Sequence, residues 1–144
     1  MKSPAVSVCL MAVVLACGCA PLTFSEPGAV DFERYPSVQV VVDAPFLGDP
    51  SAYLAGALRA SSGFYHVTSG VEPTDLILTV QVSVTEDLLS DDLEYDAHAS
   101  YRATTPRGSV VDEGTEDDTS STPSEAAEDV LDEVSLRYIR PYRL

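Results

Sequence analysis

The sequence predicts an α+β domain: a two-layer sandwich with a mainly antiparallel sheet of four or five strands and two helices on one face. Two long segments, residues 75–85 and 94–104, alternate apolar and polar side chains, which is typical of strands with one buried face. Two segments with helix-capping signals flank the strand-rich middle. Because no strand-helix-strand unit repeats, we expect the order β-α-β-β-β-β-α and two layers.

The first half of this order begins with the valine-rich residues 37–43, a strand expected to be buried on both faces. Asp49 followed by Pro50 is typical of a helix start, since proline at the first helical position loses no hydrogen bond. Gly63 is expected to end this helix, and residues 64–67 to form a short strand. The apolar face of the helix comprises Tyr53, Leu54, Ala57 and Leu58.

The second half contains the two alternating strands, 75–85 and 94–104, joined by a polar connection. Residues 105–108 form a turn with both Pro and Gly, so residues 109–114 should return as a last strand. Residues 116–121 are acidic and rich in hydroxyl groups, and we interpret them as a mobile loop.

The clearest predicted helix starts at Thr122. Thr122, Pro123 and Glu125 match a capping box, and Pro141 stops the helix. Its late arginines suit the negative end of the helix dipole. Its apolar stripe consists of Ala127, Val130, Leu131, Val134 and Tyr138.

The first residues resemble a bacterial lipoprotein leader. An apolar run over residues 5–15, too short to span a bilayer, precedes two cysteines, Cys17 and Cys19. Both fit a lipobox, in which the cysteine is acylated and becomes the mature N-terminus. The aliphatic residue three places upstream favours Cys17, with Cys19 as the alternative. Residues 1–16 (or 1–18) are then the signal peptide, 17–36 the lipidated cysteine and a flexible tether, and 37–144 a single domain.

Acylation would hold the protein at a membrane, and the absence of aspartate after either cysteine favours the outer membrane by resemblance to proteobacterial sorting. All three cysteines lie in the leader, so the mature domain has neither a disulfide nor a thiolate site. After leader removal seven arginines face 23 acidic residues, a net charge of −16. This charge argues against nucleic acid as a partner.

Four features of the mature chain form a pattern: the valine strand before Pro45-Phe46, Gly63 to Val67 after the helix, Thr74 to Leu78 with its opening aspartate, and Arg107 to Val111. With these features the chain resembles a group of small outer-membrane lipoproteins with an α/β sandwich. These are the lipopolysaccharide-assembly lipoprotein, the activators of penicillin-binding proteins, the curli secretion lipoprotein and the amino-terminal domain of TolB. The resemblance implies a fold and a scaffold-like role, and no catalytic residue.

No catalytic signature and no cofactor motif is found. The two histidines, His66 and His98, lie on predicted strands, and His98 is expected at the surface between Asp96 and Ser100. No Gly-x-Ser-x-Gly elbow occurs. The sequence therefore predicts that the protein is not an enzyme.

The connection 86–94 carries several acids that could bind calcium, although their spacing is not that of an EF-hand and a solvated loop is favoured. Four of them form the alternative metal site: Asp87, Asp91, Asp92 and Glu94. Leu88, Leu89 and Leu93 form either an apolar tip for a partner or a contact beneath the sheet edge.

The C-terminal tail combines arginine and tyrosine, which are enriched in binding hot spots. It is a candidate partner contact, and the alternative is that it folds back on the acidic body. The residues concerned are Arg137, Tyr138, Arg140, Tyr142 and Arg143.

These observations lead to one main expectation: an acylated lipoprotein, facing the periplasm, that serves as a non-catalytic envelope scaffold or interaction module. Its partners would be the membrane, through the acyl chains, and another envelope protein. The alternative is a calcium- or small-molecule-binding lipoprotein that uses the acidic loop 86–94.

Overall fold

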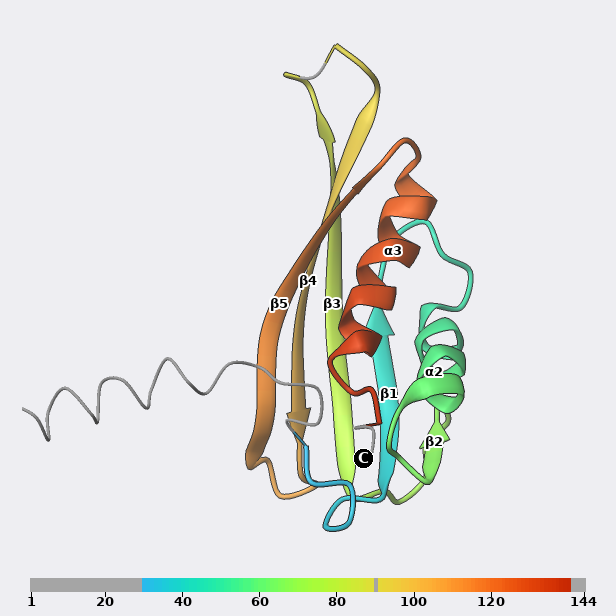
Figure 1. Ribbon diagram of the computed structural model, residues 1–144, viewed down its shortest axis with the longest axis vertical. Coiled ribbons are helices and arrows are strands. Elements are labelled where there is room, and N and C mark those ends of the chain that lie inside the picture. The colour runs from blue at the N-terminus through green and yellow to red at the C-terminus, as the bar shows by residue number, and fades with distance from the viewer. Residues whose placement is uncertain (1–29, 90, 141–144) are drawn as a thin grey trace, which may run out of the picture.

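The computed structural model describes residues 30–89 and 91–140. Within these residues the elements follow the predicted order and form one mixed sheet with two helices (Figure 1). Their bounds are β1 Ser37–Asp43, α2 Pro50–Ser61, β2 His66–Thr68, β3 Leu76–Asp87, β4 Glu94–Thr104, β5 Val110–Ser120 and α3 Pro123–Leu136. The α+β class and the element order are confirmed.

The sheet has the strand order β2-β1-β3-β4-β5. β1 is parallel to both β2 and β3, whereas β3-β4-β5 is an antiparallel meander. The longest pairing joins β3 and β4 from Ile77↔Thr104 to Asp87↔Glu94. A one-residue slip of this register would turn the buried valines outward, so the alternating pattern also specifies the pairing.

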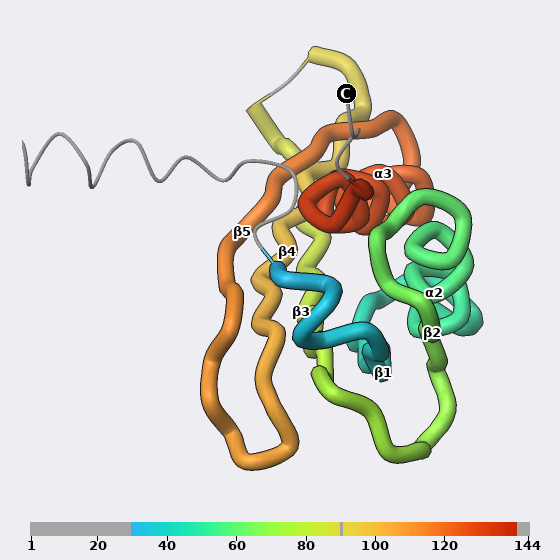
Figure 2. The backbone as a smooth tube through the Cα atoms, turned by 60° about the horizontal axis from the view of Figure 1, so that its bottom comes forward, coloured from blue at the N-terminus to red at the C-terminus, as the bar shows by residue number. Residues whose placement is uncertain are grey.

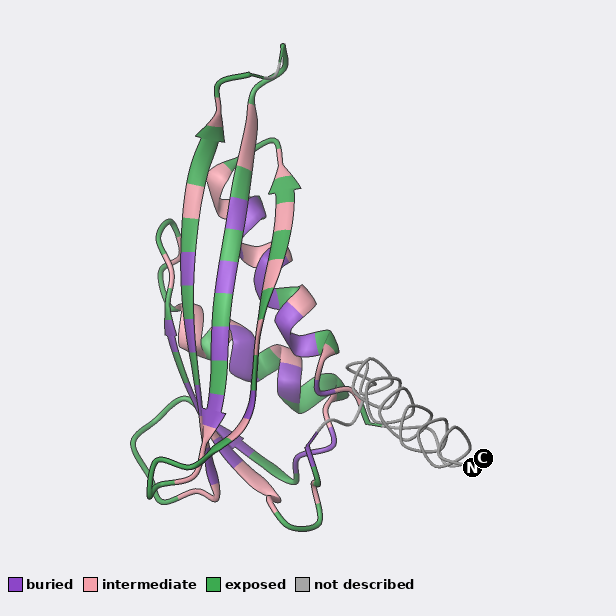
Figure 3. Ribbon diagram, turned by 90° about the vertical axis from the view of Figure 1, so that its left-hand side faces the viewer, coloured by how far each residue is buried: buried purple, intermediate pink, exposed green. Residues whose placement is uncertain are grey.

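Both helices cover the same face of the sheet. α3 lies over β3, β4 and β5, and α2 lies over β1 and β2 (Figures 1 and 2). Buried and exposed positions alternate along the central strands (Figure 3). The alanines of β4 let α3 approach the sheet closely, because their side chains are short. The largest fully buried side chains are Tyr138, Leu54, Leu58, Leu76, Leu78 and Leu131.

Asp75 fixes the start of the parallel pair β1–β3. One oxygen, Oδ2, accepts hydrogen bonds from the backbone N–H of Ser37 at 3.1 Å and from its hydroxyl at 2.7 Å. The Asp75 N–H in turn donates to Ser37 Oγ at 2.9 Å. This reciprocal clamp joins residues that are 38 positions apart in the chain, which explains why an aspartate stands before the central strand.

The packed region starts earlier than the expected boundary at residue 37. Val30 is 2% exposed, and Phe32 packs edge-on against Phe64 with ring centroids 4.8 Å apart. Gly63 lies against the Phe32 ring, where a Cβ atom would collide with it. Residues 30–36 therefore belong to the domain instead of the tether. Gly63 was expected to end α2, but α2 ends at Ser61 with Ser62 as its C-cap. Gly63 instead leaves room for the Phe32 ring.

Residues 116–120, which were expected to form a loop, are the second half of β5. The predicted strand 109–114 was therefore too short. β5 pairs with β4 from Thr104↔Val110 to Tyr95↔Ser120. Aspartate and glutamate disfavour strands by propensity, but the pairing with β4 overrides that preference. β1 also differs from the expectation, since Val41 is 42% exposed and only Val38, Val40 and Val42 are buried.

α3 starts as predicted, with the Thr122 hydroxyl accepting from the Glu125 N–H at 3.2 Å. The Glu125 carboxylate accepts from the Ser120 hydroxyl at 3.0 Å, so it also joins the helix to β5. None of the helices within residues 30–89 and 91–140 is long and apolar enough to cross a membrane.

Asp112 of β5 forms the buried polar contact between the sheet and the end of α3. Its carboxylate accepts from Arg137 at 2.8 and 3.2 Å and from the Tyr138 hydroxyl at 3.0 Å. Burial, followed by the nearby Asp112 charge, raises the pKa of Tyr138 well above its usual value. The hydrogen bond to Asp112 raises the pKa of Arg137. Arg137 and Tyr138 thus stay protonated, as their hydrogen bonds to Asp112 require.

We expect Asp112→Ala to lower the free energy of unfolding by about 3–5 kcal/mol, because it leaves the Arg137 charge in a poorly solvated position. Urea unfolding measures this loss. The adjacent Glu113→Ala removes only the exposed pair with Arg102 and should cost under about 1 kcal/mol. In the double variant Asp112→Ala/Arg137→Met, part of the loss should be recovered. An Asp112→Ala protein as stable as Glu113→Ala would contradict the role given to this contact.

Candidate functional site

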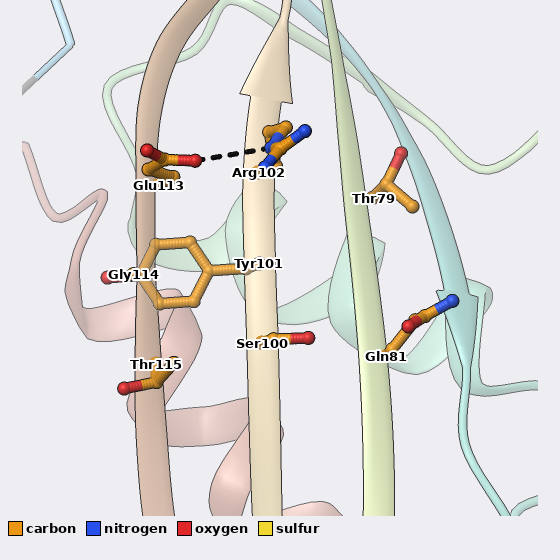
Figure 4. A pocket seen from close by; sticks show the side chains of 8 residues that line it. All are labelled: Thr79, Gln81, Ser100, Tyr101, Arg102, Glu113, Gly114 and Thr115. Carbon is orange, nitrogen blue, oxygen red and sulfur yellow. Dashed lines mark ion pairs between the residues drawn. The ribbon is translucent and has the colours of Figure 1, made fainter.

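The face of the sheet opposite the helices is uncovered in the described part of the chain, and most of its side chains are polar. On this outer face β3, β4 and β5 surround a shallow hollow of about 600 Å³ (Figure 4). Hydroxyl, amide and charged groups line it: Thr79 and Gln81 from β3, Ser100 and Arg102 from β4, and Glu113 and Thr115 from β5.

Cross-strand pairs between β4 and β5 hold the charged groups of this outer face. Arg102 Nε lies 3.2 Å from a Glu113 carboxylate oxygen, and His98 Nδ1 lies 2.7 Å from Asp117. The Thr119 hydroxyl donates to Asp96 at 3.0 Å. The side chains of the two ion pairs are more than half exposed, so these pairs add little stability and mainly order the surface.

Tyr101 and Gly114 close the hollow from the inner side. The Tyr101 ring extends from β4 across Gly114 of β5 (Figure 4), where a Cβ atom would collide with the hydroxyl. Tyr101 also meets the Tyr138 ring at a centroid distance of 6.3 Å. Burial raises the pKa of Tyr101. Glycine at this strand position is thus required by the aromatic ring that crosses it.

A second feature, which we call the acidic seam, runs along the inner side of β5 beside α3. Its helix residues are four positions apart and share one side of α3. Its members are Glu116 and Asp118 of β5 and Glu125, Asp129 and Glu133 of α3.

The carboxylates of the acidic seam disfavour one another's charge. Burial and then the charge of Glu133 raise the pKa of Glu116. Burial and then the charge of Asp118 raise the pKa of Asp129. Arg137 is near enough to lower the pKa of Glu116 in part, but its ion pair is made with Asp112. No ion pair joins a seam residue to a cation in the described part of the chain.

The β3–β4 hairpin extends past the helical layer and ends in exposed leucines (Figure 1). Leu88, Leu89 and Leu93 are 83%, 97% and 58% exposed. Of the two interpretations of these residues, the structure favours the apolar tip over packing beneath the sheet edge. The tip lies at the end of the domain opposite residues 30–36 (Figure 1).

The candidate contact residues of the tail do not share one environment. Tyr138 is 0% exposed, and the Arg137 side chain is 13% exposed, so both serve the internal contact with Asp112. Arg140 is exposed, and its N–H donates to the Ser61 carbonyl at 3.1 Å. Tyr142 and Arg143 lie outside the described residues. The helix end thus folds back on the acidic body up to Arg140.

The alternative calcium site gains no support. Within residues 30–89 and 91–140, no three His, Cys, Asp or Glu side chains are placed to hold a metal ion. Asp87, Asp91, Asp92 and Glu94 lie at the hairpin end, where the Asp87 carboxylate accepts from the Leu89 N–H at 3.0 Å. The candidate lipidation residues Cys17 and Cys19 lie outside the described part.

Each histidine has an acidic neighbour. His98 lies on the outer face as expected, and its partner is Asp117 of the adjacent strand. His66 pairs with Glu72 in the loop that follows β2. The sequence does not predict the acidic seam, because residues 116–121 have the composition of a loop. Residues 115–119 read Thr-Glu-Asp-Asp-Thr without any apolar-polar alternation, so only the pairing of β5 with β4 separates Glu116 and Asp118 from Asp117.

No protein-family model and no curated protein matches the sequence. Solved structures do match the fold. The PelC dodecamer of Paraburkholderia phytofirmans is 22% identical, with a TM-score of 0.57 over 75% of this chain and 90% of that one. Protein CT253 of Chlamydia trachomatis is 10% identical, with a TM-score of 0.55 over 72% and 95%.

A minor lipoprotein of Acinetobacter baumannii is 15% identical, covering 70% of this chain and 87% of that one. Its TM-score is 0.48. The PelC and CT253 structures, with TM-scores above 0.5, share the fold of this chain. The class that the fold and surfaces define is a small two-layer α+β domain with one open sheet face.

We expect Glu116→Gln to stabilise the protein at neutral pH. Because the pKa of Glu116 is raised in the folded state, its ionisation costs stability as the pH rises through that pKa. The variant should melt about 2 °C higher at about pH 7.5, and the difference should vanish below about pH 4.

Thermal unfolding followed by circular dichroism across this pH range measures the effect. Glu113→Gln is the matched control, since Glu113 lies on the outer face of the same strand and pairs with Arg102. It should not raise the melting temperature. A Glu116→Gln protein that melts below the parent at neutral pH would contradict the interpretation of the acidic seam.

Proposed function

We propose that the chain is an acylated lipoprotein of the bacterial envelope whose domain works as a non-catalytic interaction module. The observation that carries the interaction role is the sheet itself: its outer face has no covering layer in the described residues, and β5 ends the sheet with a long edge. Open faces and edges of this kind are surfaces for binding other chains. The similar structures share the fold, and fold alone does not assign chemistry.

The acyl chains would hold the domain at a membrane. Residues 5–15 followed by Cys17 or Cys19 support this part of the proposal. Thirteen peptide units separate Cys17 from Val30, the first described residue, and span at most about 45 Å. The membrane would hold the end of the domain near Val30, so the leucine tip of the β3–β4 hairpin would point away from that membrane. The absence of aspartate after the cysteine supports the outer membrane as the location, with the domain in the periplasm.

We expect the protein expressed in a host with lipoprotein processing to incorporate labelled palmitate. Cys17→Ala should abolish the label and Cys19→Ala should leave it, because the residues before Cys17 fit a lipobox better. Mass spectrometry of the mature N-terminus identifies the acylated residue. Loss of label only in Cys19→Ala would move the site by two residues, and label retained in the double variant would refute the anchor.

We further propose that copies of the chain assemble with one another. The similar PelC structure is described as a dodecamer, and the open outer face leaves surface for such contacts. The strong negative charge opposes assembly at low ionic strength, so added salt should favour it.

Light scattering after size exclusion of the detergent-solubilised protein should therefore show an oligomer whose population increases with salt. The variant Thr79→Glu/Ser100→Glu adds further negative charge to the outer face and should shift the distribution toward monomer. A monomer at all salt and protein concentrations would refute self-assembly.

A further inference from the structure

The outer edge of β5 is the long free edge of the sheet. β5 pairs with β4 on one side, and no described strand pairs with its other side. The opposite edge, β2, has only three residues, whereas β5 has eleven. An unpaired strand of this length presents a row of backbone donors and acceptors that another extended segment can use.

The acidic seam runs beside this edge. Glu116 and Asp118 belong to β5 itself, and Asp129 and Glu133 of α3 face them. Like charges four residues apart on a helix cost stability, as do carboxylates kept close to one another on adjacent elements. Local arrangements that cost stability without an internal compensation are typical of functional surfaces. Cations from outside would remove this cost.

We propose that the free edge of β5 binds an extended segment of another protein that carries Lys or Arg at alternate positions. The added strand would continue the sheet by backbone hydrogen bonds. Its basic side chains would lie against the acidic seam. The inference rests on the proposed function as an interaction module and names the chemistry of the partner.

The alternate spacing of the basic residues in the partner segment follows from strand geometry. Neighbouring strands lie about 4.8 Å apart, and side chains two residues apart point to the same face. Glu116 and Asp118 are two residues apart on the inner face. A segment with basic residues at alternate positions would therefore direct every cation to the acidic seam, whereas consecutive basic residues would direct half of them to the outer face.

A second copy of this chain does not fit the edge. Its basic residues are Lys2 and seven arginines, and no two of them are two positions apart. Pairing β5 with the β5 of another copy would bring carboxylates together, which is destabilising. The self-assembly proposed above must then use a different surface.

The test uses the full-length protein in detergent and a fluorescent peptide of about nine residues with lysine at alternate positions and threonine or valine between them. Two control peptides carry the same number of lysines. In one, the lysines are consecutive; in the other, every amide is N-methylated, which keeps the charges and blocks strand pairing. Fluorescence anisotropy measures binding, and hydrogen exchange reports the protection of amides in residues 110–120.

Two protein variants locate the site. Glu116→Gln/Asp118→Asn/Glu133→Gln removes three charges of the acidic seam. Asp87→Asn/Asp91→Asn/Asp92→Asn removes the same number of charges at the hairpin end. We expect the first variant to bind the alternating peptide roughly tenfold more weakly and the second to bind it nearly as the parent does.

We also expect the β5 amides to exchange more slowly with the alternating peptide, and both control peptides to bind roughly tenfold more weakly. The proposal is overturned if the alternating peptide does not bind, if the N-methylated peptide binds equally well, or if both triple variants weaken binding alike. Because the assay does not depend on the acyl chains, its failure would leave the palmitate result intact. Absence of palmitate would likewise leave the peptide result intact.

Discussion

One buried carboxylate, that of Asp112, joins the acidic edge strand β5 to the end of α3. β5 contributes few apolar side chains to the core, and Gly114 replaces a side chain where Tyr101 crosses the strand. Backbone pairing with β4 and the contact of Asp112 with Arg137 and Tyr138 hold it in place. The outer hollow and the acidic seam both depend on the position of β5, so this contact and the pairing with β4 together position both surfaces.

The domain separates its packing from its surfaces. Two helices and the inner face of the sheet form the core. The outer face, the β5 edge and the hairpin tip therefore contribute little to packing. The acidic seam costs stability in isolation, because burial and neighbouring charge both disfavour its ionised carboxylates. The large negative charge keeps such a surface soluble and attracts basic partners over several ångströms.

The similar structures show that this fold tolerates large differences in sequence. PelC and CT253 share the fold at identities of 22% and 10%, so the sheet and helices persist where most side chains differ. Packing and register conserve such an architecture, while exposed faces and edges are free to change. The functional question for this chain therefore concerns its acidic edge and open face more than its core.

The sequence by itself determined the element order, the α+β class and the inward face of each central strand. The reason is local: side-chain alternation in β3 and β4 and the Thr122 cap act within one element. Tertiary structure decided three further points: that residues 30–36 join the core, that β5 continues to Ser120, and that Arg137 and Tyr138 turn inward to Asp112. Each depends on a partner distant in sequence, such as the Phe64 ring for Phe32 or β4 for β5. Local propensity alone does not predict contacts with such distant partners.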